Sequence, residues 1–144
     1  MKRFTRVLLL VIALMAVAVV VAACSGGGAA VPEACQEEGA CAVIPAGESI
    51  KVGFSGPMVG DVSNYGIDMS QGAELGLADS GQIEGFDVEL VAEDDQGSPE
   101  GGAAVANKFV SDQEVVAVAG PAFSGATRAA TPIYEAANIP MVSM

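Results

Sequence analysis

The sequence contains no histidine, and it has only three cysteines among its 144 residues. Without histidine, so few cysteines do not complete the four nitrogen or sulfur ligands of a zinc site. A serine nucleophile would likewise lack, within these residues, the histidine base that activates it in serine hydrolases. We therefore expect no metal site and no catalytic triad in this stretch of chain.

Basic residues are also scarce, with six Lys and Arg against eighteen Asp and Glu. Three of the basic residues lie in the first six positions, and residues 1–24 contain no acidic residue. Behind position 24 the chain therefore carries three basic and eighteen acidic residues, a net charge of −15. Such a charge repels phosphate backbones and excludes a nucleic-acid partner. It suits a dispersed extracytoplasmic protein.

The first 24 residues have the pattern of an export signal. Lys2, Arg3 and Arg6 precede an unbroken apolar run over residues 7–21. The run closes on small residues before Cys24, which resembles the lipobox of bacterial lipoproteins. We predict a signal peptide over residues 1–23 and lipidation of Cys24, which places the rest of the chain outside the cytoplasm, anchored to a membrane. An uncleaved anchor over residues 7–24 is the alternative, at the lower limit of length for a bilayer span.

Residues 24–48 carry no apolar periodicity and are rich in Gly, Ala, Pro and Glu. We expect a flexible tether. Cys35 and Cys41 fall within it, and we predict that they form a disulfide because disulfides persist outside the cytoplasm. Two free thiols are the alternative.

From Ser49 onward, strand patterns alternate with helix patterns. Strands are predicted at residues 50–54, 86–92, 115–119 and 141–142, and helices at about 65–79, 99–110 and 124–137. Ser98 and Pro99 begin the second helix as N-cap and first residue, and Pro132 should kink the third. The β-α-β-α-β-α-β order predicts an α/β fold with a parallel sheet. The final strand pattern stops at Met144, so we expect an incomplete lobe.

Ligands of such sheets bind at the carboxyl ends of the strands. Three predicted loops lie there, at residues 55–64, 93–97 and 120–124. No dinucleotide or P-loop motif occurs in them, which favours a protein without a cofactor. Asp94 and Asp95 could hold Mg²⁺, although a solvated turn is the simpler interpretation.

Ser124 is the remaining candidate for chemistry. It begins a predicted helix, where free backbone N–H groups and the helix dipole attract anions. Ser124 either caps its own helix, contributes a hydroxyl to an anion site, or does both. The surrounding segment 122–126 also resembles a nucleophile elbow, but Ala122 stands where that motif has glycine.

Blocks of residues in order along 49–144 resemble the amino-terminal lobe of the branched-chain amino-acid-binding proteins, which feed ABC importers. These blocks are Ile50-Lys51-Val52-Gly53, Gly56-Pro57, Tyr65-Gly66, Gly72-Ala73-Glu74, Glu93-Asp94-Asp95, residues 104–108 and residues 120–140. The resemblance implies a non-enzymatic type I periplasmic-binding-protein fold of two lobes that close on a ligand.

The resemblance also implies site residues. Ser124 matches the serine that receives the ligand carboxylate, with Gly125 beside it, and Tyr65 matches an aromatic residue that lines the pocket. Some members join two strand-end loops by a disulfide, and Gly97 and Phe123 occupy those positions here. Phe123 places bulk beside Ser124, so the ligand could be a branched-chain amino acid, another small amino acid, an amide, urea or an aromatic acid.

We therefore expect a membrane-tethered solute-binding protein with two partners, a small-molecule ligand and an ABC permease. The same fold could instead serve as a sensory domain of a receptor. A secreted serine hydrolase using Ser124 is the remote alternative.

Overall fold

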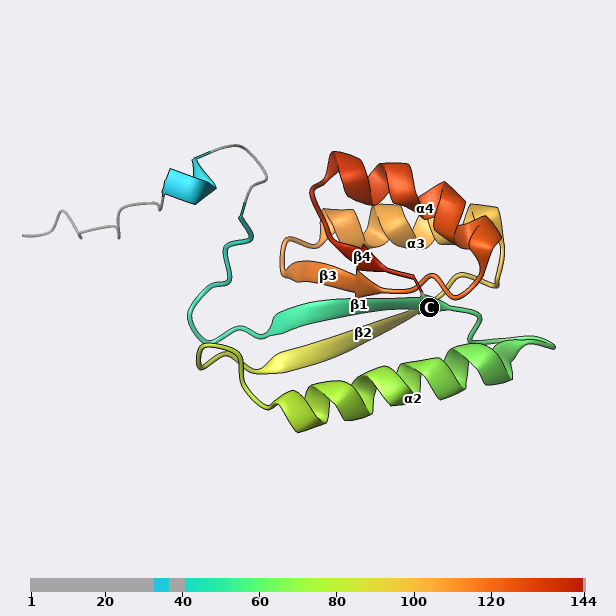
Figure 1. Ribbon diagram of the computed structural model, residues 1–144, viewed down its shortest axis with the longest axis horizontal. Helices are drawn as coiled ribbons and strands as arrows, with labels where there is room; N and C mark the ends of the chain where they lie inside the picture. The colour runs from blue at the N-terminus through green and yellow to red at the C-terminus, as the bar shows by residue number, and fades with distance from the viewer. Residues whose placement is uncertain (1–32, 37–40, 144) are drawn as a thin grey trace, which may run out of the picture. The chain divides into compact units, whose positions relative to one another are not determined.

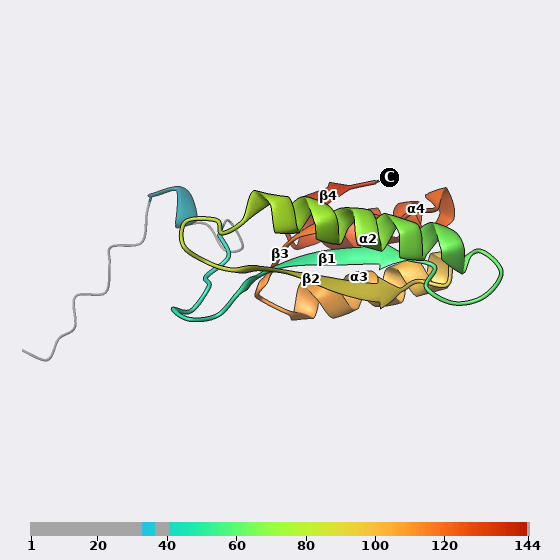
Figure 2. The ribbon, with the colours of Figure 1, turned by 90° about the horizontal axis from the view of Figure 1, so that it is seen from below.

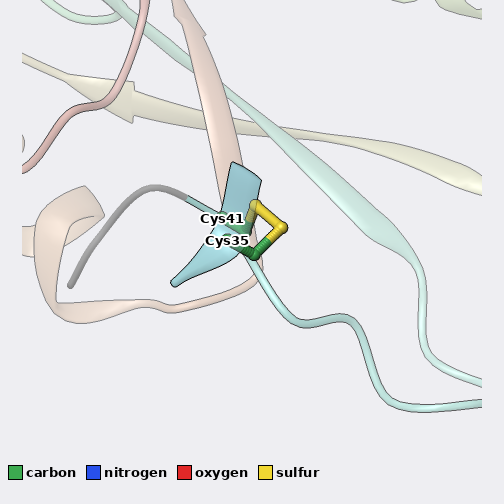
Figure 3. The surroundings of a disulfide bond; sticks show 2 residues. All are labelled: Cys35 and Cys41. Carbon is green, nitrogen blue, oxygen red and sulfur yellow. A yellow bond between two sulfur atoms is a disulfide. The ribbon is translucent and has the colours of Figure 1, made fainter. Parts of the chain in front are cut away.

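The computed structural model describes residues 33–36 and 41–143. The predicted signal peptide and the predicted lipidation site Cys24 lie outside the described residues. The predicted tether contains a short 3-10 helix, η1 (Glu33–Cys35), and a disulfide that joins Cys35 to Cys41 (Figure 3). Among the residues that are described, no helix has the length and apolar character needed to cross a membrane.

Four strands form one parallel sheet, which confirms the predicted α/β class and the predicted order of elements. The strands are β1 (Ile50–Gly56), β2 (Val88–Asp94), β3 (Val115–Ala119) and β4 (Met141–Val142). They lie in the order β2-β1-β3-β4, and each neighbouring pair is parallel.

The helices cover both faces of this sheet. Helix α2 (Ser63–Ser80) lies on one face, whereas α3 (Pro99–Ser111) and α4 (Ser124–Ala136) lie side by side on the other (Figures 1 and 2). The chain leaves β1 through α2 toward β2, and it leaves β3 through α4 toward β4. These two connections run in opposite directions from adjacent strands, which makes the carboxyl ends of β1 and β3 a topological switch point.

The predicted bounds of the second strand were wrong by two residues at each end. The acidic residues from Glu93 onward predict an end at position 92, but backbone pairing continues, with Ser55 opposite Glu93 and Gly56 opposite Asp94. At the other end, Phe86 forms an isolated bridge with Ile83 and does not belong to the strand. Backbone pairing with a buried neighbour therefore outweighed side-chain polarity.

The core lies between the sheet and the helix pair α3–α4. The apolar face predicted for α3 is confirmed, because Gly102, Val105, Ala106 and Phe109 are all buried. Helix α4 buries Ala126 and Ala130 as predicted, and it continues through Pro132. The sequence pattern missed Tyr134, which is only 1% exposed. Burial raises the pKa of this phenol above its usual value.

Candidate functional site

The candidate site lies at the carboxyl edge of the sheet, where the loops after β1, β2 and β3 meet. These loops span residues 57–62, 95–98 and 120–123. Figure 1 shows that α2 and α4 both begin at this edge, on opposite faces of the sheet. A ligand at the switch point would therefore contact the first turns of two helices from different layers.

Asp94 ties the first loop to the second. Its Oδ1 atom accepts hydrogen bonds from the backbone N–H of Met58, at 2.8 Å, and of Gln96, at 3.0 Å. Residues 94 and 58 are far apart in the chain, so this carboxylate fixes the spacing of two loops that flank the switch point.

Asp95 is fully buried, and its carboxylate accepts two hydrogen bonds. The Ser55 hydroxyl donates to Oδ2 at 2.8 Å, and the backbone N–H of Gly97 donates to Oδ1 at 2.8 Å. Both aspartates thus serve as anchors for loops, and the described residues contain no cluster of three metal-ligating side chains. The interpretation of these residues as a solvated turn is wrong for Asp95, because its carboxylate is buried and hydrogen-bonded within the fold.

The third loop is held by hydroxyl groups that the sequence analysis did not identify. The Thr127 hydroxyl donates to the carbonyl of Phe123, at 3.0 Å, or of Pro121, at 3.1 Å. The Ser143 hydroxyl, beyond β4, lies 3.4 Å from the same Pro121 carbonyl. The sequence does contain a signal for the Thr127 contact. A threonine four residues after a helix N-cap often donates its hydroxyl to the carbonyl one turn earlier.

Of the alternatives for Ser124, the one in which it caps its own helix is wrong. Phe123 is the N-cap residue of α4, and no side chain caps that helix. Ser124 is instead the first helical residue; it is exposed, and its hydroxyl has no hydrogen-bond partner among the described residues. The first-turn N–H groups, including those of Ser124 and Gly125, point out of the helix and attract negative charge. The other interpretation of Ser124, as part of an anion site, is compatible with this geometry.

Tyr65 and Phe123 meet beside this helix terminus. Their rings pack edge to face, with centroids 6.3 Å apart and planes at 63°. Tyr65 belongs to the first turn of α2 and remains 53% exposed. The structure thus brings together at one edge all four residues that the sequence analysis assigned to ligand binding: Tyr65, Phe123, Ser124 and Gly125.

A hollow of about 490 Å³ lies at the opposite edge of the sheet. The ends of α3 and α4 and the start of β3 line it, together with residues 41–43. None of the four candidate ligand residues lies there. The position of the switch point, rather than the volume of this hollow, therefore locates the candidate site.

Comparisons with known proteins agree with this architecture. Residues 49–144 match the sequence family described as "Periplasmic binding protein". The Leu/Ile/Val-binding protein of Escherichia coli K12 is 39% identical over 99 residues, which cover 67% of this chain and 27% of that protein. A leucine-, isoleucine-, valine-, threonine- and alanine-binding protein of Pseudomonas aeruginosa is 36% identical over 101 residues, covering 68% and 27%.

Solved structures show the same fold. The branched-chain amino acid transporter substrate-binding protein LivJ of Streptococcus pneumoniae, solved with isoleucine, is 34% identical with a TM-score of 0.62, over 67% of this chain and 28% of that chain. A Rhodopseudomonas palustris solute-binding protein, solved with 4-hydroxybenzoate, is 28% identical with a TM-score of 0.61, over 67% and 27%. This chain thus spans about a quarter of the length of its relatives. Through residues 49–144, the chain belongs to the periplasmic binding protein family.

Proposed function

We propose that this chain supplies part of the first lobe of an extracytoplasmic solute-binding protein that captures a small amino acid for an ABC importer. The observation that carries the proposal is the uncapped start of α4 at the switch point of the sheet. Free first-turn N–H groups and the Ser124 hydroxyl lie there beside two aromatic rings. An anionic group and an apolar group on one small molecule would satisfy both features.

In this proposal the carboxylate of the ligand binds at the start of α4. The N–H groups of Ser124 and Gly125 would donate to it, and the Ser124 hydroxyl would add a third donor. The partial positive charge of the helix terminus favours an anion at this point. Because no side chain of α4 occupies these donors, the ligand would not have to displace an existing cap.

The apolar part of the ligand is placed against Tyr65 and Phe123. Both rings leave surface uncovered at the edge of the sheet, and an aliphatic or aromatic side chain would remove that surface from water. The relatives include proteins that bind leucine, isoleucine and valine, and one solved with 4-hydroxybenzoate. We therefore propose that the ligand is a hydrophobic amino acid or, more widely, another small carboxylate with an apolar group. A second lobe would supply the partner for the ammonium group.

The proposed role requires capture and release without breaking a bond, so the protein is not an enzyme. Lipidated Cys24 would hold it at the outer side of a membrane, and the tether over residues 24–48 would allow the binding lobe to reach a permease in that membrane. The tether contains the Cys35–Cys41 disulfide, which is compatible with an oxidising compartment.

Isothermal titration of the complete polypeptide tests the proposal. The panel contains leucine, isoleucine, valine, alanine and 4-hydroxybenzoate, with leucinamide as the matched control. Leucinamide keeps the side chain of leucine but lacks its carboxylate. We expect binding of at least one amino acid and much weaker binding of the corresponding amide. Absence of heat with every member of the panel would overturn the proposal.

A further inference from the structure

We infer that Gly97 is a positioning residue for ligand recognition. Its missing side chain allows the ring of Phe123 to lie across the loop after β2 and to face Tyr65. Gly97 thereby sets how closely the Phe123 ring approaches Tyr65 and Ser124, beside which we place the ligand. This inference rests on the proposed function, and it adds to the site a residue from the second of the three loops.

The space above Gly97 is filled by the Phe123 ring. A Cβ atom built on Gly97 would lie 2.8 Å from Cδ2 and 3.0 Å from Cε2 of Phe123. Carbon atoms in contact prefer separations of about 3.5–4.0 Å, so the ring and a side chain at position 97 cannot keep their present places together. The backbone of Gly97 also has a φ of +63°, which favours glycine.

The loop after β2 cannot easily move away from the Phe123 ring, because hydrogen bonds hold Gly97 in place. Its N–H donates to Oδ1 of Asp95 at 2.8 Å. Asp95 is fully buried and is held in turn by the hydroxyl of Ser55 in β1. Pro57 lies nearby, with its Cβ 3.8 Å from the same built atom. A side chain at position 97 would therefore displace the ring rather than the loop.

The backbone of Phe123 is fixed as well, so only its side-chain torsions can respond. Its carbonyl accepts the backbone N–H of Thr127, at 2.9 Å, and the hydroxyl of Thr127, at 3.0 Å. On leaving Gly97 the ring would turn toward Tyr65 and the start of α4. That movement would bring the ring into the space where we place the side chain of the ligand, so larger ligands should lose more affinity than small ones.

The test uses the complete polypeptide with leucine and alanine as probes. Gly97→Ala should raise the Kd for leucine by about tenfold or more, the usual scale for overpacking, and should raise the Kd for alanine much less. The matched control is Gly81→Ala, at the C-terminal end of α2 and outside the three loops. Gly81 also has a positive φ, +67°, but nothing lies within 4 Å of a Cβ built there. Gly81→Ala should leave the ratio of the two Kd values unchanged.

Repeating the test in the Phe123→Ala variant separates the effect of the Phe123 ring from backbone strain at position 97. In Phe123→Ala protein the ring is absent, so adding Gly97→Ala should no longer change the leucine-to-alanine ratio. An equal change of that ratio in both backgrounds would overturn the inference. An unchanged ratio in the Gly97→Ala single variant would also overturn it.

A readout without ligand distinguishes this inference from the proposed function. In wild-type protein the Phe123 ring should shift the proton resonances of the Gly97 Cα by its ring current, and Phe123→Leu should remove that shift. Wild-type protein that binds neither leucine nor alanine would overturn the role of Gly97 in recognition, and only failure of the whole ligand panel would also overturn the proposed function. Binding of both probes without the ring-current shift would overturn the Gly97 inference alone.

Discussion

The ring of Tyr65 packs edge-on against the ring of Phe123, with centroids 6.3 Å apart. Tyr65 lies in the first turn of α2 on one face of the sheet, and Phe123 is the N-cap residue of α4 on the other face. The contact therefore joins the two layers across the switch point between β1 and β3. Edge-to-face pairs contribute about 0.5–1.5 kcal/mol beyond their buried area, so the contact favours this arrangement of the two helix starts.

Ser124→Ala should weaken binding of a carboxylate ligand by about 1–3 kcal/mol, because a charged acceptor loses one donor. Titration of the complete polypeptide with leucine measures the change. Thr131→Ala is the control. Thr131 lies two turns further along α4, is exposed, and donates its hydroxyl to the Thr127 carbonyl. Equal affinities of Ser124→Ala and wild-type protein would contradict a role for the hydroxyl.

Asp95→Ala should lower the free energy of unfolding by about 3 kcal/mol. The change leaves two buried donors without their acceptor, the Ser55 hydroxyl and the Gly97 N–H. Urea denaturation of the complete polypeptide measures it. Asp87→Ala removes an exposed carboxylate that accepts only from the Gln82 amide, and it should change stability by less than about 0.5 kcal/mol. Similar stabilities for the two variants would show that Asp95 is not an anchor.

Two glycines of α2 should respond to alanine with opposite signs. A Cβ on Gly66 would lie 2.1 Å from the Pro57 carbonyl oxygen, so Gly66→Ala must push the helix away from the loop and should cost at least about 2 kcal/mol. Nothing lies within 4 Å of a Cβ on Gly72, so Gly72→Ala should stabilise the helix by about 0.5–1 kcal/mol. Thermal unfolding compares them, and the same sign for both would refute this packing.

The ion pairs of Lys51 should make the free energy of unfolding depend on pH in the acidic range. Its ammonium lies 2.9 Å from Asp112 and 2.7 Å from Glu114. The hydrogen bond from Lys51 lowers the pKa of Asp112, while the bonds to Glu114 and then Asp112 raise the pKa of Lys51. The pKa of the Asp112 carboxyl is about 4 in the unfolded chain and lower in the folded protein. Its ion pair therefore stabilises the fold at pH values above about 4, and this contribution disappears as the pH falls through the pKa of the folded state.

Lys51→Met should therefore destabilise the protein at pH 7, and the difference from wild type should shrink at pH 3. Urea midpoints at the two pH values measure it. Arg128→Met is the control, because Arg128 forms no ion pair with another described residue. A difference between Lys51→Met and wild type that stays constant from pH 7 to pH 3 would contradict the assignment.

Cys24→Ser should abolish lipid attachment if Cys24 is the acylated residue. Radiolabelled palmitate should enter the wild-type protein in a bacterial host and should not enter the variant, which should leave the membrane fraction. Cys35→Ser/Cys41→Ser is the control, since it removes the other two cysteines and should retain the label. Label in the Cys24→Ser variant would contradict the proposed anchor.

Sequence patterns alone were enough to predict which helices and strands form and in what order. The periodicity of α3, with Val105, Ala106 and Phe109 on one face, and its N-cap, where the Ser98 hydroxyl accepts the Gly101 N–H at 3.0 Å, are both confirmed. The alternation of strands with helices was enough to predict a parallel sheet. These features depend on residues within a few positions of one another, so their physics is local and can be read along the chain.

The contacts among the residues at the carboxyl edge, by contrast, depend on the tertiary structure. Ser55 and Asp95 are 40 positions apart, and their hydrogen bond exists because β1 and β2 are neighbours in the sheet. The burial of Tyr134 and the contacts of Phe123 with Gly97 and Tyr65 likewise depend on which elements are adjacent. No local pattern encodes such distances, because strand order and the side-chain torsions of Phe123 are set by the packing of the whole sheet and its helices.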